Sequence, residues 1–425
     1  MSTRLPEVYH AVLLHGERVG TLCQRGDYTR FVLSPSYLDE PRRPVLGLRF
    51  EERLTASYAA ALRLPRWFSN LLPEGPLRDW IAQDRGVALD REMELLAQVG
   101  HDLPGGVQVV PAAGPDEDWE WSEASALGTA RADASAPAES PWRFSLAGVA
   151  LKFSMLSQGD RLTVPVGGQL GDWLVKFPDV RHPCVPQNEY AMMRLAAAAG
   201  IEVPEVRLVH RDELIGLPAV MWPNEEEWAY AVRRFDRTLD PARTRIHIED
   251  FAQVRDIYPI DKYQSSFETV AALAYRGQHV DDLREAVRRI VFAVLIGNGD
   301  AHLKNWSLIY PDRVNPRLSP AYDLVSTVPY APEGRGEDLG LKLQGSRRFE
   351  TVTAQSFRRL ESRLDRRFGA TQARLTDVAA ETVERTLAGW PEAEERLADV
   401  AGLGRDVGVW LKTSSGRMMR TRPAG

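Results

Sequence analysis

The stretch Ile296–Asn305, which reads I-G-N-G-D-A-H-L-K-N, decides the fold together with Asp323 of the later P-A-Y-D-L. Asp300 and Asn305 are five positions apart, and the second aspartate follows downstream. In phosphoryl transfer a carboxylate accepts the proton of the attacking hydroxyl, while amide and carboxylate oxygens hold the magnesium ion that bridges the nucleotide phosphates. The spacing therefore predicts a kinase, with Asp300 as the catalytic base and with Asn305 and Asp323 as magnesium ligands.

A simpler interpretation of the same residues is an ordinary turn. Asn and Gly tolerate positive φ, and Asp readily bonds its own backbone. The preceding segment favours a site, because Asp281–Gly297 places apolar residues at helical spacing. A buried helix would then end where the polar cluster begins, and such a rigid element is what a preorganised site requires.

Composition excludes several classes of protein. With 53 basic and 59 acidic residues among 425, the net charge of −6 argues against a dedicated nucleic-acid binder. Cys23 and Cys184 have no metal-ligand spacing. Met1–His10 lacks the pattern of a secretory signal, and the apolar run Ile290–Ile296 is too short to span a bilayer. We expect a cytoplasmic protein without membrane contact.

The first part of the chain indicates a β-rich domain. Val8–Leu14, Arg18–Cys23 and Tyr28–Ser34 are short apolar runs separated by turn residues, which is typical of a β-meander. From Gly114 to Pro141 the composition shifts to Ala, Ser, Gly, Asp and Glu, which predicts a linker or an exposed insertion and a domain boundary.

The middle of the chain offers candidate phosphate-binding lysines. Phe144–Phe153 suits a strand-loop-strand flap whose backbone N–H groups and Lys152 could meet phosphate, although a plain hairpin has the same pattern. Lys176 lies in the expected strand Asp172–Pro178, where a lysine normally faces water.

A helix is expected to follow this strand. We expect Asn188 to cap a helix Glu189–Ala199. Glu189 could then form the ion pair with Lys176 that orients nucleotide phosphates in kinases, or could simply suit a helix N-terminus.

Further along the chain, Trp228–Phe235 reads as a strand that would form the hinge of a two-lobed kinase. His247, Glu249 and Asp250 are a possible metal trio by residue type, but acidic residues at a helix N-terminus account for the same letters. After Asn305 we expect a strand, a turn and a returning strand Ser319–Asp323, which would let Asn305 and Asp323 share one cation.

The predicted fold class is α+β. We expect a two-lobed protein-kinase-like fold with a small β-rich N-terminal subdomain and a mostly α-helical C-terminal lobe. The expected ranges are a β-rich domain at 1–113, a linker or insertion at 114–141, a kinase-like N-lobe with phosphate loop and hinge at 142–238, a helical C-lobe at 239–411 and a flexible polar tail at 412–425.

An ordered set of motifs resembles one known family. The chain carries S-L-A-G-V-A-L-K at 145–152, W-L-V-K-F-P at 173–178, N-E-Y at 188–190, R-F-D-R at 234–237, then G-N-G-D-A-H-L-K-N and S-P-A-Y-D-L. Leu71–Pro76, L-L-P-E-G-P, adds a match near the N-terminus. The whole chain is similar to the HipA-like serine/threonine kinase toxins of bacterial toxin-antitoxin modules. Lys262-Tyr263-Gln264 departs from the pattern, because Ser265-Ser266-Phe267 follows where a Gly-Gly-Pro segment is expected.

The resemblance implies an ATP-dependent protein kinase with ATP and Mg²⁺ in its active site. It implies Asp300 as the catalytic base, Asn305 and Asp323 as metal ligands, and Glu189 as the partner of Lys176. Autophosphorylation at Ser145 would eject the phosphate loop and silence the enzyme. The resemblance assigns ATP binding to Ala147, Gly148, Val149, Lys152, Lys176, Arg233, Arg234, Phe235, His302, Lys304 and Tyr322.

The family also implies partners. These are a small helix-turn-helix (HipB-like) antitoxin, operator DNA reached mainly through that antitoxin, and a protein substrate such as an aminoacyl-tRNA synthetase, particularly the glutamyl enzyme. Two alternatives stay open: a small-molecule kinase of the antibiotic-phosphotransferase type, and a non-catalytic corepressor that acts with a DNA-binding antitoxin.

Overall fold

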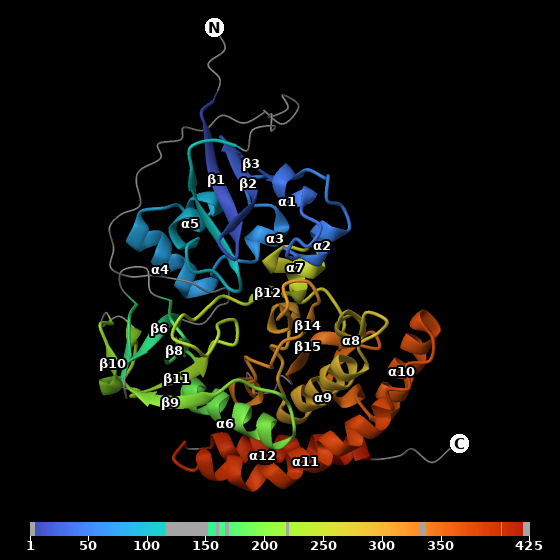
Figure 1. Cartoon of the computed structure of the whole chain (residues 1–425). Helices are drawn as coiled ribbons and strands as arrows, with labels where there is room; N and C mark the ends of the chain where they lie inside the picture. The colour runs from blue at the N-terminus through green and yellow to red at the C-terminus, as the bar shows by residue number, and fades with distance from the viewer. Residues whose placement is uncertain are drawn as a thin grey trace.

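An N-terminal β-rich domain lies above a sheet-containing lobe and a helical lobe that stand side by side (Figure 1). The structure is a computed structural model that describes residues 5–115, 152–158, 161–165, 170–217, 221–331, 337–400 and 402–419. The predicted flap residues Ser145, Ala147, Gly148 and Val149, and all but two residues of the 114–141 segment, lie outside these ranges.

The N-terminal domain contains an antiparallel five-stranded sheet in the order β4-β3-β2-β1-β5. The predicted β-meander is confirmed, because β1 pairs with β2 and β2 pairs with β3. Its strands are β1 Glu7–Leu14, β2 Glu17–Arg25, β3 Tyr28–Leu33, β4 Tyr58–Ala61 and β5 Val107–Ala112, and its helices are α1 Pro35–Asp39, α2 Leu48–Glu51, α3 Arg66–Ser69, α4 Gly75–Arg85 and α5 Glu92–Val99.

The second sheet has six strands in the order β10-β7-β6-β8-β11-β9. These strands are β6 Lys152–Gln158, β7 Arg161–Thr163, β8 Trp173–Lys176, β9 Val206–His210, β10 Leu214–Ile215 and β11 Trp228–Arg233, and helix α6 spans Val185–Ala198. Side chains alternate along a strand, so β11 serves two cores. Ala229 and Ala231 belong to the core shared with the N-terminal domain, whereas Tyr230 and Val232 belong to the core shared with α6 and the helical lobe.

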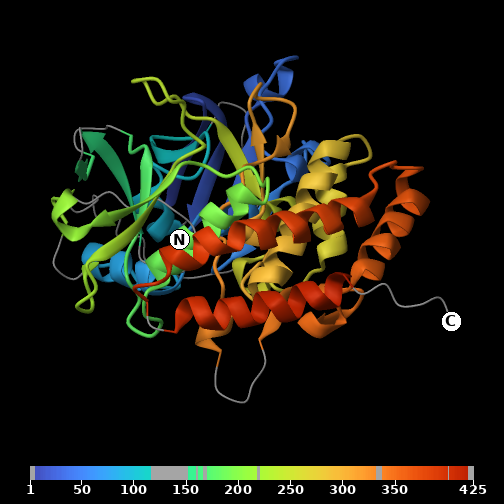
Figure 2. The same cartoon turned by 90° about the horizontal axis from the view of Figure 1, so that it is seen from below.

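The helical lobe is built around α9, which is buried along most of its length. Figure 2 shows α11 and α12 crossing the lower face of the molecule. The elements of this part are β12 His247–Asp250, α7 Phe251–Val254, α8 Phe267–Tyr275, α9 Val280–Ile296, β13 Ser307–Tyr310, β14 Arg317–Leu318, β15 Asp338–Leu343, β16 Ser346–Arg348, α10 Ala354–Phe368, α11 Leu375–Arg396 and α12 Leu403–Met419. The helix predicted before the polar cluster is confirmed.

The predicted start of α6 is wrong. The helix begins at Val185 with Pro186 in its first turn, so Asn188 lies inside it and Glu189 lies in its second turn. A proline in the first turn needs no N–H partner, which allows the earlier start. The Asn188 amide instead donates to the carbonyl of Ser326 at 2.9 Å, and its Oδ1 accepts the N–H of Ser326 at 3.1 Å.

Three other boundaries also differ from the prediction. His247 and Glu249 lie on strand β12 rather than in a helix, and only Asp250 caps a helix, α7. The returning strand is the short β14, and Ser319–Asp323 follows it without strand structure. Residues 412–419 are not a flexible tail, because α12 continues to Met419. The polar composition of this segment gives no sign of a buried helical face, but Ser414, Ser415 and Met418 are buried on one.

A buried charge cluster joins the N-terminal domain to the end of β11. Asp102 pairs with Arg234 Nη1 at 3.2 Å and with Arg237 Nη2 at 2.8 Å, and both guanidinium groups also contact Asp236. Gly105, at φ +76°, donates its N–H to Asp236 at 2.8 Å. A Cβ there would lie 2.6 Å from the backbone nitrogen of Ile248, so this close approach of two chain segments requires glycine.

We expect Asp102→Ala to destabilise the protein by about 3–5 kcal/mol, because it leaves two buried guanidinium groups with one carboxylate. Urea unfolding followed by fluorescence measures this loss. Asp377→Ala is the matched control, because Asp377 pairs with Arg374 on the surface and should change the free energy of unfolding by no more than about 0.5 kcal/mol. Equal small effects of both variants would contradict a structural role for the cluster.

Candidate active site

The loop after α9 fixes the relative position of Asp300 and Asn305. Gly297 ends the helix in the left-handed conformation at φ +66°, which glycine adopts without strain. The N–H of Asp300 donates to Asn298 Oδ1 at 2.9 Å, and the amide nitrogen of Asn305 donates to the carbonyl of Asp300 at 2.9 Å. The loop is thus closed on itself, and the amide oxygen of Asn305 is kept for another partner.

The segment carrying Asp323 is attached to the same loop. Tyr322 donates its phenol hydrogen to the carbonyl of Lys304 at 2.9 Å, and its oxygen lies 2.6 Å from Ser307 Oγ. Asp323 has φ +61°, a left-handed conformation that aspartate tolerates better than most residues. Asp300, Asn305 and Asp323 line one cavity, so the arrangement on which the sequence interpretation depends is present.

Two lysines face this loop from the six-stranded sheet. Lys152 on β6 and Lys176 on β8 are directly opposite strand partners, and both are buried. Lys176 Nζ lies 2.6 Å from Glu189 Oε1 and 2.5 Å from Asp323 Oδ1. The predicted Lys176–Glu189 ion pair is therefore present, although the expectation that a lysine in this strand faces water is wrong.

Burial and neighbouring charges set the protonation of these groups. Burial alone would raise the pKa of Asp323, but the ammonium groups of Lys176 and Lys152 lower it below its usual range. The pKa of Lys176 is raised despite burial, because Asp323 and Glu189 favour its charged form. Burial and the charge of Lys176 lower the pKa of Lys152 to about 8. The cavity therefore keeps a firmly charged lysine next to one that loses its proton in mildly alkaline solution.

The predicted hinge residues Arg233, Arg234 and Phe235 line the cavity. The ring of Phe235 lies 5.6 Å from that of Tyr322. The guanidinium of Arg234 is held in the buried charge cluster, and that of Arg233 lies 3.5 Å from Glu205 and 5.8 Å from the ring of Trp173. Both guanidinium groups therefore have partners within the protein, and both residues border the cavity.

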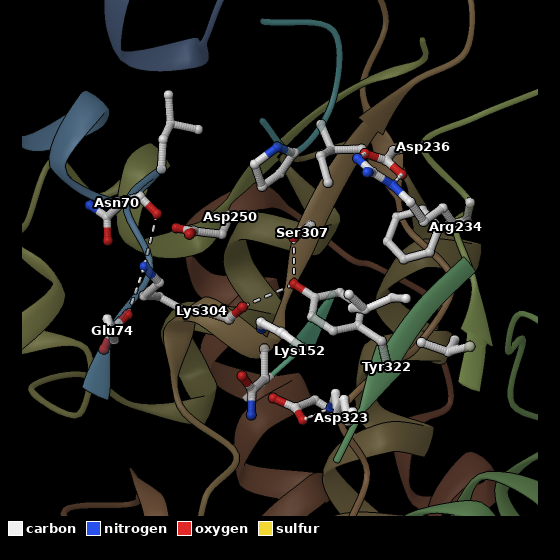
Figure 3. Close-up of a pocket in the computed structure, with 18 of the residues that line it drawn as sticks. Asn70, Glu74, Lys152, Arg234, Asp236, Asp250, Lys304, Ser307, Tyr322 and Asp323 are labelled. Carbon is white, nitrogen blue, oxygen red and sulfur yellow. Dashed lines mark hydrogen bonds and ion pairs between the residues drawn. The ribbon is translucent and has the colours of Figure 1, made fainter. Parts of the chain in front are cut away.

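His302 and Lys304, the other predicted site residues of the Asp300–Asn305 loop, have different surroundings. His302 is buried, and its Nε2 lies 3.9 Å from Asp300 Oδ1. Burial lowers its pKa, which favours a neutral imidazole. The side chain of Lys304 points toward the N-terminal domain, where it donates to the carbonyl of Asn70 at 2.9 Å and pairs with Glu74 at 2.9 Å (Figure 3).

Two contacts at the site were not expected from the sequence. Tyr263 donates its phenol hydrogen to Asp300, and its ring lies edge-on to His302 at 5.0 Å. Glu74 comes from the N-terminal domain, more than 200 residues away from Lys304 in the chain. The K-Y-Q and L-L-P-E-G-P motifs contain these residues, but neither motif shows which loop its side chains will contact.

A second cavity adjoins the first and shares several of its lining residues. Both cavities are bordered by Lys176, Glu189, Asp300 and Asp323. The second is also lined by Trp80, Phe177, Pro178, Tyr263 and Glu337.

The possible metal trio is used for other contacts. His247 Nε2 lies 2.8 Å from the carbonyl of Leu46, and Glu249 accepts the N–H of Leu48 at 2.9 Å. Asp250 accepts the N–H of Gln253 at 2.8 Å as the cap of α7. Within the described ranges, no group of three or more His, Cys, Asp and Glu side chains is arranged to hold a metal ion. These contacts contradict a metal site at the trio.

The donor set at Asn305 and Asp323 nevertheless suits magnesium. Magnesium prefers oxygen ligands and commonly takes only one or two from the protein, with phosphates and water supplying the rest. The charged carboxylate of Asp323 and the available amide oxygen of Asn305 match that requirement.

The fold defines the class of protein. A HipA chain in the solved complex of Shewanella oneidensis HipA, HipB and operator DNA superposes with a TM-score of 0.72 and 20% sequence identity, over 96% of this chain and 97% of that chain. The predicted two-lobed kinase-like fold is thereby confirmed. Of the helices in the described ranges, none is long and apolar enough to cross a membrane.

Sequence comparison gives the family. The model of the HipA-like C-terminal domain matches residues 144–390, and that of the HipA N-terminal domain matches residues 10–110. A Sinorhizobium fredii protein named "Putative kinase Y4dM" is 40% identical over 92% of this chain and 93% of its own length. The serine/threonine-protein kinase toxin HipA of Shewanella oneidensis is 28% identical over 61% of this chain and 62% of its own length. The chain belongs to the HipA family.

We expect Asp323→Val to be less stable than Asp323→Asn by about 1–3 kcal/mol. Both variants remove the charge that faces Lys176, but a β-branched side chain is strained at φ +61°, whereas asparagine adopts this conformation readily. Urea unfolding of the two variants measures the difference. Equal stabilities would show that the backbone at 323 relaxes out of the left-handed conformation.

Proposed function

We propose that this chain is an ATP-dependent protein serine/threonine kinase that acts as the toxin of a toxin-antitoxin module. The observation that carries the proposal is the pair of buried lysines on adjacent strands, opposite Asp323 and the Asp300–Asn305 loop. Lys176 is paired with Glu189 and Asp323, and the buried ammonium group of Lys152 beside it adds positive charge that a bound anion would help to offset. Nucleotide phosphates are the anions that these surroundings fit.

The proposed reaction follows from the placement of the side chains. Lys176, held by Glu189, and Lys152 would contact the phosphates, while the backbone after β11 and Phe235 border the space for adenine. A magnesium ion bound by Asn305 and Asp323 would neutralise charge on the phosphates. Asp300 would accept the proton of the acceptor hydroxyl as its oxygen bonds to the γ-phosphorus, and the bond from that phosphorus to the departing ADP breaks.

The second cavity supports a protein acceptor. Its lining combines apolar side chains with Asp300, which suits a peptide segment that carries a serine or threonine. Tyr263 already donates a hydroxyl hydrogen to Asp300, so this carboxylate is placed to accept such a bond. An aminoacyl-tRNA synthetase, particularly the glutamyl enzyme, is the proposed substrate class, and Ser145 is the proposed autophosphorylation site.

The relatives support the toxin-antitoxin context. The related Shewanella oneidensis protein is named a serine/threonine-protein kinase toxin, and the similar solved structure contains HipA, HipB and operator DNA. We propose a HipB-like helix-turn-helix antitoxin as partner, operator DNA contact mainly through that partner, and function in the cytoplasm.

Two other functions predict different outcomes in the same assay. A small-molecule kinase would transfer phosphate to a metabolite and to no protein. A non-catalytic corepressor would show no magnesium-dependent nucleotide binding. The paired lysines and the closed Asp300–Asn305 loop favour catalysis over a non-catalytic corepressor role, and the nature of the labelled acceptor separates a protein kinase from a small-molecule kinase.

With radiolabelled ATP and magnesium, we expect labelled phosphate on Ser145 or on a protein in a cell lysate. We expect Asp300→Ala to lower the rate of this transfer by about 10²–10⁴-fold, because the proton acceptor is lost. Phosphopeptide mapping identifies the acceptor. Asp281→Asn is the matched control: it alters an exposed aspartate at the start of the same α9 and should leave the rate unchanged. Undiminished transfer by Asp300→Ala would contradict the assignment of the base.

We expect the affinity for ATP to weaken as pH rises through about 8, by up to about tenfold per pH unit, because Lys152 must regain its proton to meet the phosphates. Lys176 stays charged in this range, since its pKa is raised. Equilibrium binding between pH 7 and 9.5 measures the slope. In Lys152→Met the affinity should be weaker and nearly independent of pH, and an unchanged slope in that variant would assign the titration to another group.

A further inference from the structure

The N-terminal domain reaches the candidate active site through one carboxylate. Glu74 immediately precedes α4, and its side chain is 17% exposed. It makes no hydrogen bond that caps this helix. Instead Glu74 Oε1 lies 2.9 Å from Lys304 Nζ, and Glu74 Oε2 lies 2.9 Å from Lys262 Nζ. Figure 3 shows Glu74 and Asn70 gathered around Lys304 at one wall of the cavity.

Lys304 connects this carboxylate to the metal-binding side of the site. It directly precedes Asn305, and its carbonyl accepts the hydroxyl hydrogen of Tyr322, the neighbour of Asp323. A shift of the Lys304 backbone would therefore move both proposed magnesium ligands.

Lys262 connects the same carboxylate to the catalytic base. It directly precedes Tyr263, whose phenol donates to Asp300. The carbonyl of Lys262 also accepts the N–H of Leu303 in the catalytic loop at 3.2 Å. Lys304 is part of the Asp300–Asn305 loop, Lys262 is bonded to that loop at Leu303, and Glu74 pairs with the ammonium groups of both lysines.

The charges show that Glu74 carries out this task in its ionised form. Burial would raise its pKa, but Lys304 and Lys262 lower it to about 2. The side chains of both lysines are buried, so removal of the carboxylate charge would leave two ammonium groups close together without compensation. Relaxation of that repulsion would displace the loop that both lysines hold.

We propose that Glu74 of the N-terminal domain is a positioning residue for phosphoryl transfer, which holds the Asp300–Asn305 loop in its reactive geometry through Lys304 and Lys262. This inference rests on the proposed kinase function. It makes the N-terminal domain a working part of the active site rather than a separate module. A contact that only joins the domains would change the free energy of unfolding alone, whereas a positioning residue also changes the rate of the chemical step.

The test compares Glu74→Gln with the full-length wild-type protein in the phosphotransfer assay. We expect kcat to fall by about 100-fold, as small displacements of reacting groups can cause. The KM for ATP should stay within about threefold or decrease, because the lysine charge near the phosphates is no longer offset. Arg66→Gln is the matched control, because Arg66 also joins this domain to the lobe, through Asp256 at 3.4 Å, without touching the loop. Its kcat should equal that of the wild type.

A double variant separates positioning from general damage. If Glu74 acts through Lys304, then Lys304→Met alone should lower kcat strongly, and Glu74→Gln added to it should lower kcat by no more than about threefold further. Independent, multiplicative losses of kcat in the double variant would overturn the inference. Wild-type kcat in Glu74→Gln would also overturn it, as would a rise in the KM for ATP as large as the fall in kcat. Absence of phosphotransfer by the wild-type protein would instead overturn the proposed function itself, and the inference with it.

Discussion

The ammonium group of Lys176 joins the two lobes at the candidate active site. It lies between Glu189 on α6 and Asp323 from the helical lobe, and its strand partner Lys152 adds a second positive charge beside it. A buried charge of this kind is stable only with well-placed partners, so the sheet, the helix and the segment that carries Asp323 must keep one arrangement. The rest of the site is built around that requirement: Tyr322 ties Asp323 to the catalytic loop, and Asn305 ties the loop to Asp300.

The N-terminal domain is joined to the two lobes by charge as well as by apolar packing. Its core continues into one face of the six-stranded sheet through Phe153, Val175 and Ala229. Asp102 holds the two arginines that follow β11, and Glu74 holds the two lysines beside the catalytic loop. The Asp102 contacts therefore stabilise the side of the cavity next to the end of β11. The Glu74 contacts stabilise the side next to the Asp300–Asn305 loop. The division of the chain into separate domains at the predicted boundaries stays a prediction. The charged contacts show that the N-terminal part is bonded to both sides of the cavity.

Local sequence signals predicted local structure well where one physical effect dominated. The apolar spacing of α9 and the glycine that ends it indicated a buried helix leading into the catalytic loop. The signals failed where distant partners decided the outcome. Asn188 has the chemistry of a helix cap, but it bonds Ser326 from inside the helix, and a polar composition concealed the buried face of α12.

By itself, the sequence determined which chemistry is available: the carboxylates, amide and lysines of phosphoryl transfer at spacings that a loop and a strand pair can bring together. Only the tertiary structure decided that Lys152 and Lys176 are buried side by side, that Arg234 serves the hinge junction, and that Glu74 meets Lys304. The physical reason is that burial and pairing of charge depend on groups far apart in the chain. Their energies are set by the shared surroundings of those groups rather than by neighbouring letters.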